Sequence, residues 1–196
     1  FEDELDEGWE MIDADGDGFN WEHVLPEDNE NGGINTYSGL GVATSNSYDN
    51  DSQTALTPDN FLVTPAFEVP EDATLSWYVE GQDPNWCEEH YAVYAVEGEV
   101  TAEALDALEP LYEGEASDEF TGHTVGLDDY VGKTVRIVFR HYNITDMYMI
   151  NIDDIGVYAI SGEVPQPTMV TVTYVDGVTG EVIAAETVEP GSDVNR

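Results

Sequence analysis

The sequence is poor in cysteine and in positive charge. Of its 196 residues only one is cysteine, and 4 Lys and Arg stand against 43 Asp and Glu, which gives a formal net charge of -39. A single cysteine, Cys87, excludes an intrachain disulfide, so an extracellular chain of this kind would depend on its core and on bound metal for stability. The shortage of Lys and Arg excludes the basic face that nucleic acids require and disfavours anionic membrane surfaces. The same charge favours divalent cations as ligands.

Long apolar runs are missing as well. No segment has the roughly 20 apolar residues of a transmembrane helix, and no signal-peptide pattern is present, so we expect no direct membrane insertion. Hydrophobic residues nevertheless make up 41% and aromatic residues 11%, which is too much for a disordered acidic tail. Because the chain begins with Phe1 and stops within a pattern at Arg196, we expect a fragment of a longer protein. Its charge disfavours self-association, so we expect this fragment to be monomeric.

What is present is a series of short alternating segments bounded by Gly, Pro, Asn and Asp. Such segments are typical of β-strands, and little of the chain looks helical apart from 101–108, where Thr101 is a suitable N-cap. Many short strands with turn signals between them predict an all-β sandwich with one short helix. The predicted strands are 60–64, 74–79, 90–96, 133–140 and one long strand over 149–158. In 74–79, Leu75, Trp77 and Val79 lie on one face. In 133–140, Val135, Ile137 and Phe139 point inward, and Arg136 and Arg140 point outward.

The chain divides into two parts. Residues 1–160 form the predicted sandwich, and 161–168, with Ser, Gly and two prolines, reads as a linker. Residues 169–196 contain two alternating runs around VDGVTGE, which is a hairpin signal. Two strands alone are marginally stable, so this hairpin is either the start of a second small β unit or an addition to the first domain.

The stretch IDADGDGFNW contains the clearest site signal. Asp13, Asp15 and Asp17 stand at alternate positions, with glycines at 16 and 18, and like charges held this close need a compensating cation. Calcium binds six to eight oxygens, and alternate side chains of a tight loop can converge on one ion, with the Phe19 carbonyl at the seventh position. The loop departs from an EF-hand because Val24 occupies the twelfth position and no helix flanks it. The sequence therefore predicts a structural calcium site rather than a catalytic one.

A remote carboxylate would have to complete this calcium shell. Asp153 and Asp154 are the candidates, because two carboxylates are otherwise hard to explain in a core strand. The sequence does not decide between them.

The sequence contains little evidence of catalytic or other binding sites. No nucleophile elbow, HExxH, CxxC or phosphate loop is present, and His90 and His141 read as hydrogen-bonded structural residues. Adjacent acids carry no signal in a chain with 43 of them. Three aromatic residues in loop-like stretches are candidate ligand contacts, since exposed aromatics stack on sugars or anchor protein partners; they are Trp86, Tyr142 and Tyr148.

Four long motifs carry a family resemblance. In chain order they are GWEMIDADGDGFNW, TPDNFLVTPAF, LSWYVEGQDPNWCEEHYAVYAV and VRIVFRHYNITDMYMINIDDIGVY, and together they span roughly residues 1–160. This series resembles the cleaved adhesin family, the haemagglutinin/adhesin domains that follow the protease in gingipains and their relatives in bacterial surface proteins. The resemblance implies a jelly-roll β-sandwich with structural calcium, in which Asp13, Asp15 and Asp17 match the acidic loop and Asp153 and Asp154 match a closing acidic pair. The segment 97–120 differs from the gingipain type, so a gingipain ligand is not implied.

The resemblance leads us to expect a non-catalytic, calcium-stabilised adhesion module of a secreted or surface-anchored bacterial protein. Its ligand would be a host or environmental glycan or protein. The alternative is a carbohydrate-binding module attached to a secreted polysaccharide-degrading enzyme or protease, because the same fold serves both roles. A structural spacer and an enzyme in its own right are further alternatives, and an exposed aromatic cluster would distinguish the binding modules from the spacer.

Overall fold

The protein is described by a computed structural model that covers residues 1, 3, 5, 7–30 and 33–159, together with the backbone of two strands at 170–175 and 182–188. The chain forms two compact units, Phe1–Ile160 and Ser161–Arg196. The predicted linker at 161–168 lies outside the described residues. Among the described residues, no helix has the length and apolar character needed to cross a bilayer.

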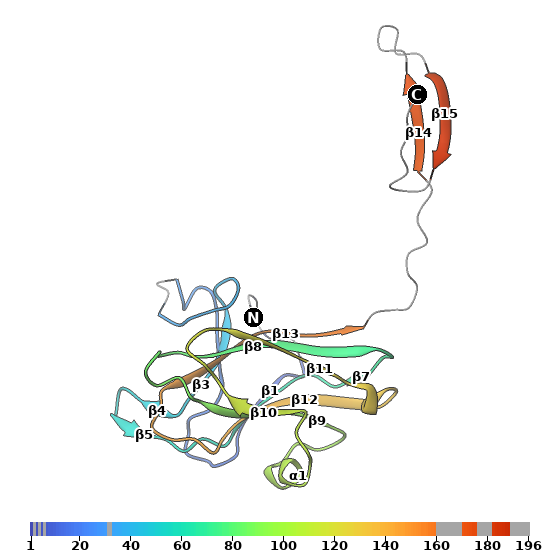
Figure 1. The fold of residues 1–196 in the computed structure, drawn as a ribbon. Helices are drawn as coiled ribbons and strands as arrows, with labels where there is room; N and C mark the ends of the chain where they lie inside the picture. The colour runs from blue at the N-terminus through green and yellow to red at the C-terminus, as the bar shows by residue number, and fades with distance from the viewer. Residues whose placement is uncertain are drawn as a thin grey trace. The chain divides into compact units, whose positions relative to one another are not determined.

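The first unit is the predicted antiparallel β-sandwich, and its first sheet includes three of the predicted strands (Figure 1). The strand order is β1-β6-β12-β9-β10, with the short β7 pairing with the start of β12. The sequence did not predict β1 or β10, which are short and lie at the sheet edges. The strands are β1 (Glu10–Asp13), β6 (Asn60–Val63), β7 (Phe67–Glu68), β9 (His90–Val96), β10 (Tyr112–Glu115) and β12 (Thr134–His141).

The second sheet has the order β11-β8-β13-β3-β2. Its longest strand, β13, is continuous as predicted, but the register with β8 shifts between Asp153 and Gly156. The strands are β2 (Glu22–Val24), β3 (Val42–Asn46), β8 (Ala73–Gly81), β11 (Thr121–Gly126) and β13 (Met149–Ala159), and the separate pair is β4 (Tyr48–Asp49) and β5 (Thr54–Ala55).

The core lies between the two sheets, and every second residue along the central strands points into it. Leu75, Trp77 and Val79 point inward from β8 and are buried, as the alternation predicts. Val135, Ile137 and Phe139 of β12 face them from the other sheet, and the Trp77 and Phe139 rings meet edge to face at 5.8 Å. Burial of this apolar surface is the main stabilising contribution in the absence of disulfides.

A second apolar cluster covers the outer face of the first sheet. The helix α1 (Ala102–Asp106) begins at the predicted N-cap, where the Thr101 hydroxyl accepts a hydrogen bond from the Ala104 N–H. Its Leu105 is fully buried against Phe61 and Val138. This sheet is therefore covered on both faces. The described residues contain one further short helix, the 3-10 helix η1 (Asp128–Tyr130).

The second unit is described only through its two strands. β14 (Val170–Val175) and β15 (Val182–Val188) pair antiparallel, with one register shift between Tyr174 and Val175.

Candidate metal loop and ligand pocket

The acidic loop follows directly from β1. Asp13 ends that strand opposite Asn60 of β6, and the next residue, Ala14, donates its N–H to the Asp59 carbonyl at 3.0 Å. Ligand oxygens of Asp13, Asp15 and Asp17 all lie within 4.8 Å of one another. The alternation of Asp with Gly or Ala therefore brings the three carboxylates together, as the spacing predicts.

The loop is wound by its own hydrogen bonds. The two oxygens of Asp13 accept the N–H groups of Gly16 and Gly18, at 2.7 and 3.0 Å. Both glycines have positive φ, 74° and 90°, which L side chains rarely adopt. The N–H of Phe19 donates to Asp17 Oδ1 at 2.8 Å and closes the turn. The loop is thus ordered while its carboxylates remain close.

Their proximity has an electrostatic cost in the absence of a cation. Desolvation in the loop, the hydrogen bond shared with Asp13 and the charges of Asp13 and Asp17 raise the pKa of Asp15 to about 6. The same shared hydrogen bond and the backbone N–H donors lower the pKa of Asp13. Ionising all three carboxylates at neutral pH is therefore unfavourable unless positive charge is supplied.

A further oxygen lies beside this loop. Asn60 is buried, and its Oδ1 has no hydrogen-bond partner, whereas its Nδ2 donates to Ser45 Oγ at 3.2 Å. Asn60 and Asp13 are register partners on adjacent antiparallel strands, so their side chains share one face. The buried Asn60 Oδ1 is therefore an unpartnered oxygen on the strand face that it shares with Asp13.

Asp153 and Asp154 lie in the other sheet, at the irregularity of β13. Asp153 Oδ2 accepts the N–H groups of Tyr37 and Ser38, at 2.9 and 3.1 Å, and Asp154 Oδ1 accepts the Ser38 hydroxyl at 2.8 Å. The structure therefore brings together three of the predicted metal ligands, with Phe19 at the loop end, and places Asp153 and Asp154 beneath the 37–38 segment.

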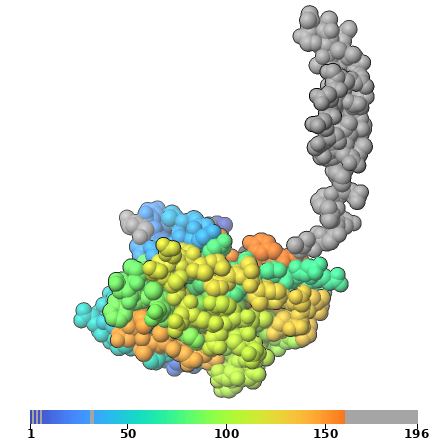
Figure 2. Space-filling view, viewed as in Figure 1, coloured from blue at the N-terminus to red at the C-terminus, as the bar shows by residue number. Residues whose placement is uncertain are grey.

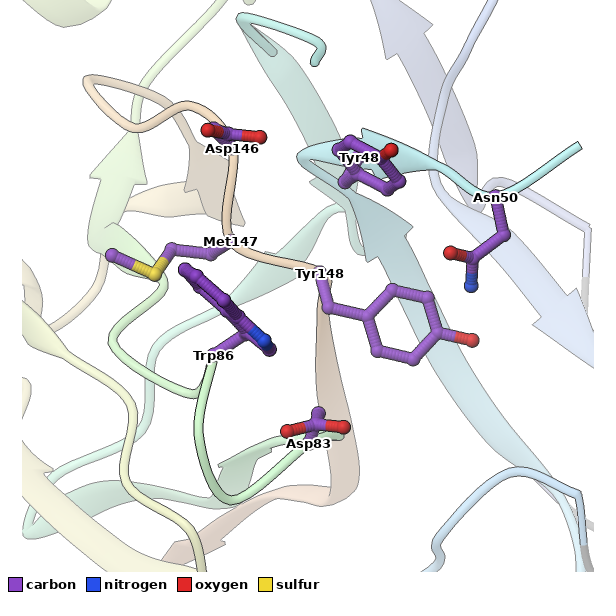
Figure 3. Close-up of a pocket in the computed structure, with 7 residues that line it drawn as sticks. All are labelled: Tyr48, Asn50, Asp83, Trp86, Asp146, Met147 and Tyr148. Carbon is purple, nitrogen blue, oxygen red and sulfur yellow. The ribbon is translucent and has the colours of Figure 1, made fainter. Parts of the chain in front are cut away.

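A ligand-sized pocket opens at one end of the sandwich. Its volume is about 570 Å³, within the range of small-molecule sites. Figure 3 shows the Trp86 indole and the Tyr148 ring on two sides of the hollow, with the Asp83 carboxylate near both. The Trp86 residue is 52% exposed, which is unusual for a tryptophan that does not bind a ligand or another protein. The pocket is lined by Tyr48, Asn50, Asp83, Trp86, Asp146, Met147 and Tyr148.

Three segments distant in sequence form this pocket. They are β4 with its following turn, the loop after β8 and the loop before β13, and Figure 2 shows them meeting at one end of the domain in cyan, green and orange. The Tyr148 carbonyl accepts the N–H of Ser47 at 3.0 Å, and the Asp146 N–H donates to the Ser47 carbonyl at 3.2 Å. Backbone hydrogen bonds thus join the pocket walls.

A buried glutamate supports the pocket from below. Glu89 is fully buried, and its Oε1 accepts both the Ser47 hydroxyl and the Tyr148 N–H, each at 2.8 Å. Its Oε2 lies 3.1 Å from His141 Nε2, and His141 Nδ1 lies 2.9 Å from Ser45 Oγ. Sequence reasoning missed Glu89, and its place directly before a strongly apolar strand is the one signal that could have identified it.

The Ser45, His141 and Glu89 side chains have the connectivity of a hydrolase triad. All three are buried, with at most 1% exposure, so the Ser45 hydroxyl cannot meet a substrate. His141 is therefore the hydrogen-bonded structural residue that the sequence predicts. His90 also has partners, the Tyr142 carbonyl at 2.9 Å and Glu113 at 3.3 Å.

Tyr142 does not belong to the aromatic pocket. It lines a separate shallow hollow, where its ring lies 4.4 Å from the Arg140 guanidinium. Arg140 is bound by both oxygens of Asp59, at 2.6 and 3.0 Å, and by Asp106 of α1 at 2.7 Å. Tyr142 thus covers the buried Arg140 and its ion pairs. Of the three aromatic residues that the sequence groups as ligand contacts, the structure brings only Trp86 and Tyr148 together.

These features were compared with known proteins. Residues 1–157 match the family model of the Cleaved Adhesin Domain. The chain belongs to the cleaved adhesin family. This cleaved adhesin domain is 33% identical over 173 residues to Gingipain R1 of Porphyromonas gingivalis, with 81% of the chain and 10% of the relative covered. It is 34% identical over 186 residues to Hemagglutinin A of the same species, with 86% of the chain and 7% of the relative covered. The chain therefore spans about a tenth or less of these curated relatives.

Solved structures agree with the family and the fold. The K1 cleaved adhesin domain of Lys-gingipain from P. gingivalis W83 matches with a TM-score of 0.68 and 30% identity, over 81% of this chain and 94% of that domain. The K3 domain matches with a TM-score of 0.63 and 32% identity, over 78% and 91%. Cleaved adhesin domains are adhesin modules and not the catalytic parts of gingipains, so this domain is non-catalytic.

Proposed function

We propose that this cleaved adhesin domain is a ligand-binding adhesion module that binds a glycan in the pocket between Trp86 and Tyr148. The exposed indole of Trp86, held in a pocket of ligand size, is the observation that supports this proposal. Since gingipains and related adhesins are secreted surface proteins, we place the protein outside the cell or on its surface.

The pocket lining suits a polyhydroxylated ring. An aromatic face binds the apolar face of a sugar, and carboxylates and amides at the rim accept or donate hydrogen bonds to hydroxyl groups. Asp83, Asp146 and Asn50 supply such groups around Trp86. Because the described residues show no cationic side chain in this pocket, hydroxyl donors fit it better than anionic ligands do.

A glycan array tests the proposal. Wild-type protein should bind a subset of neutral oligosaccharides, and Trp86→Ala should weaken that binding by roughly 30-fold, the effect of losing an anchor worth ~2 kcal/mol. Tyr158→Ala is the matched control, because Tyr158 is an exposed aromatic residue outside the pocket. Equal glycan binding by wild type and Trp86→Ala would exclude this pocket as the site.

The carbohydrate-binding module of a degradative enzyme is the second candidate, and the same lining supports it. The array separates the two, because a module of this kind should prefer plant or microbial polysaccharides over host-type glycans.

We further propose that the acidic loop binds a structural calcium ion through Asp13, Asp15 and Asp17, with Asn60 Oδ1 as an additional oxygen. The donor set fits, because calcium takes several hard oxygen ligands and the three carboxylates need positive charge. The ion would neutralise the loop and fix it against the start of β6.

Thermal unfolding tests the loop. Calcium at about 100-fold above its Kd should raise the Tm by ~5–10 °C, and EGTA should reverse the rise. Magnesium should have little effect, and Asp15→Ala should abolish most of the shift. A purified protein that contains no metal and shows no calcium-dependent shift would contradict the proposal.

A further inference from the structure

Three unpartnered oxygens lie in one row across the second sheet. Asn151 of β13 is the register partner of Thr44 on β3 and of Glu80 on β8. Directly opposed residues of antiparallel strands project from the same face, with Cβ atoms roughly 4.5–5.5 Å apart. The neighbours of Glu80 and Asn151 in sequence, Val79 and Ile152, point into the core. The row therefore lies on the outer face of this sheet, away from the sandwich interior.

The row is buried in spite of facing outward. Thr44 is 3% exposed, Glu80 5% and Asn151 0%. The segment around Asn35 and Tyr37 covers it. Tyr37 stacks on Tyr78 with ring centroids 3.5 Å apart, and the Asn35 N–H donates to Gln82 Oε1 at 2.9 Å.

Each member of the row has a polar atom without a hydrogen-bond partner. These atoms are Thr44 Oγ1, Glu80 Oε1 and Asn151 Oδ1. They are three of the four such buried atoms among the described residues, the fourth being the Asn60 Oδ1 of the acidic loop. Buried polar atoms are almost always paired, so three orphans at adjacent register positions require an explanation.

The orientation of the Asn151 amide follows from its contacts. Asn151 Nδ2 donates to Gln82 Oε1 at 2.7 Å and to the Asn35 carbonyl at 3.4 Å. A flipped amide would place Oδ1 against these two acceptors, which is repulsive. Asn151 Oδ1 therefore remains in the row with the oxygens of Thr44 and Glu80.

Among the residues that the structure describes, no basic side chain pairs with Glu80. Lys133 pairs with Glu97, Arg136 with Glu10, and Arg140 with Asp59 and Asp106. The fourth basic residue, Arg196, lies outside the described residues. Burial raises the pKa of the Glu80 carboxyl, and the neighbouring Asn35 and Asn151 amides only partly oppose that effect. A buried carboxylate without a counter-charge is costly.

We propose that Glu80, Asn151 and Thr44 form a second calcium site beneath the 33–38 segment, separate from the acidic loop. A carboxylate, an amide carbonyl and a hydroxyl are hard oxygen donors, which calcium accepts together. The ion neutralises Glu80, is coordinated by the three unpartnered oxygens and holds the 33–38 segment on the sheet.

Metal stoichiometry after equilibration with calcium tests this site. Wild-type protein is expected to bind two calcium ions, Glu80→Gln one and Asp15→Asn one. Glu68→Gln is the matched control, because it removes the same charge from an exposed strand position, and it should bind two. Thr44→Val, which preserves shape and charge, should weaken one of the two sites at least tenfold while leaving the fold intact.

The competing explanation is a protonated Glu80 that donates to Asn151 Oδ1. In that case Glu80→Gln would bind as much calcium as wild type and would be at least as stable in EGTA, and this result would overturn the proposal. If instead the acidic loop holds no ion, wild type binds one calcium, Asp15→Asn still binds one and Glu80→Gln binds none. The two sites therefore fail in distinguishable ways.

Discussion

At the scale of single residues, the domain places two ionisable groups, Glu89 and Arg140, in its interior and gives each a defined set of partners. Glu89 Oε1 accepts hydrogen bonds from Ser47 and Tyr148 at the pocket wall, and its Oε2 lies 3.1 Å from His141 Nε2. Arg140 is enclosed by Asp59 and Asp106, with the Tyr142 ring over it. A buried charge with satisfied partners specifies one arrangement of the surrounding chain, and removing one partner is strongly destabilising.

Glu89→Ala should lower the free energy of unfolding by at least about 3 kcal/mol. The change leaves the Ser47 hydroxyl, the Tyr148 N–H and His141 without their acceptor, and each unsatisfied buried group costs ~1–3 kcal/mol. Chemical denaturation measures the loss. Glu88→Ala, which alters the exposed neighbour, should change stability by less than about 0.5 kcal/mol. A loss of similar size in both variants would contradict the role given to Glu89.

At the scale of elements, alternation predicted the long strands well. β8, β9, β12 and β13 lie where the period of two placed them, because their inward residues fill one core. The edge strands β1, β10 and β11 were not predicted, since their half-exposed residues carry little apolar pattern. Alternation also cannot tell which sheet a strand joins. The acidic loop therefore lies on the sheet of β1 and β6, while Asp153 and Asp154 lie on the other one.

The end of β8 depends on a glycine that makes close backbone contact. A Cβ at Gly81 would lie 2.2 Å from the Cys87 carbonyl oxygen and 2.4 Å from the Cys87 Cα, so backbone would have to move. Gly81→Ala should cost about 1–3 kcal/mol or more and displace the loop that carries Trp86. Denaturation and Trp fluorescence measure both effects.

Gly33→Ala is the control for this prediction, because a Cβ there meets nothing within 4 Å. Unchanged stability in Gly81→Ala would contradict this prediction, because it would show that the loop after β8 moves away from the new Cβ with little loss of folding free energy.

At the scale of the whole molecule, a charge of -39 opposes compaction. The three basic side chains among the described residues are all engaged in ion pairs, so most carboxylates have no cationic neighbour. The imbalance is read directly from the sequence, and the preference for calcium inferred from it stays a prediction. It did not predict the pocket, because the pocket joins three distant loops whose approach only the fold determines.

Monovalent salt should therefore stabilise the calcium-free protein. Raising NaCl from about 0.01 to 0.5 M in EGTA shortens the screening length from ~30 Å to a few Å and weakens repulsion among the carboxylates. The Tm should rise steadily, and choline chloride should act alike if screening is the cause. A Tm that falls or stays constant would show that repulsion does not limit stability.

The few basic residues also bear on survival among proteases. An enzyme that cleaves after Lys or Arg must take such a side chain into its specificity pocket. Within the described part of the chain, the Arg136 and Arg140 side chains lie within β12 and are 18% and 6% exposed. Lys133, which directly precedes β12, is 46% exposed. A folded domain of this composition therefore offers enzymes that cleave after Lys or Arg almost no accessible site within its described residues.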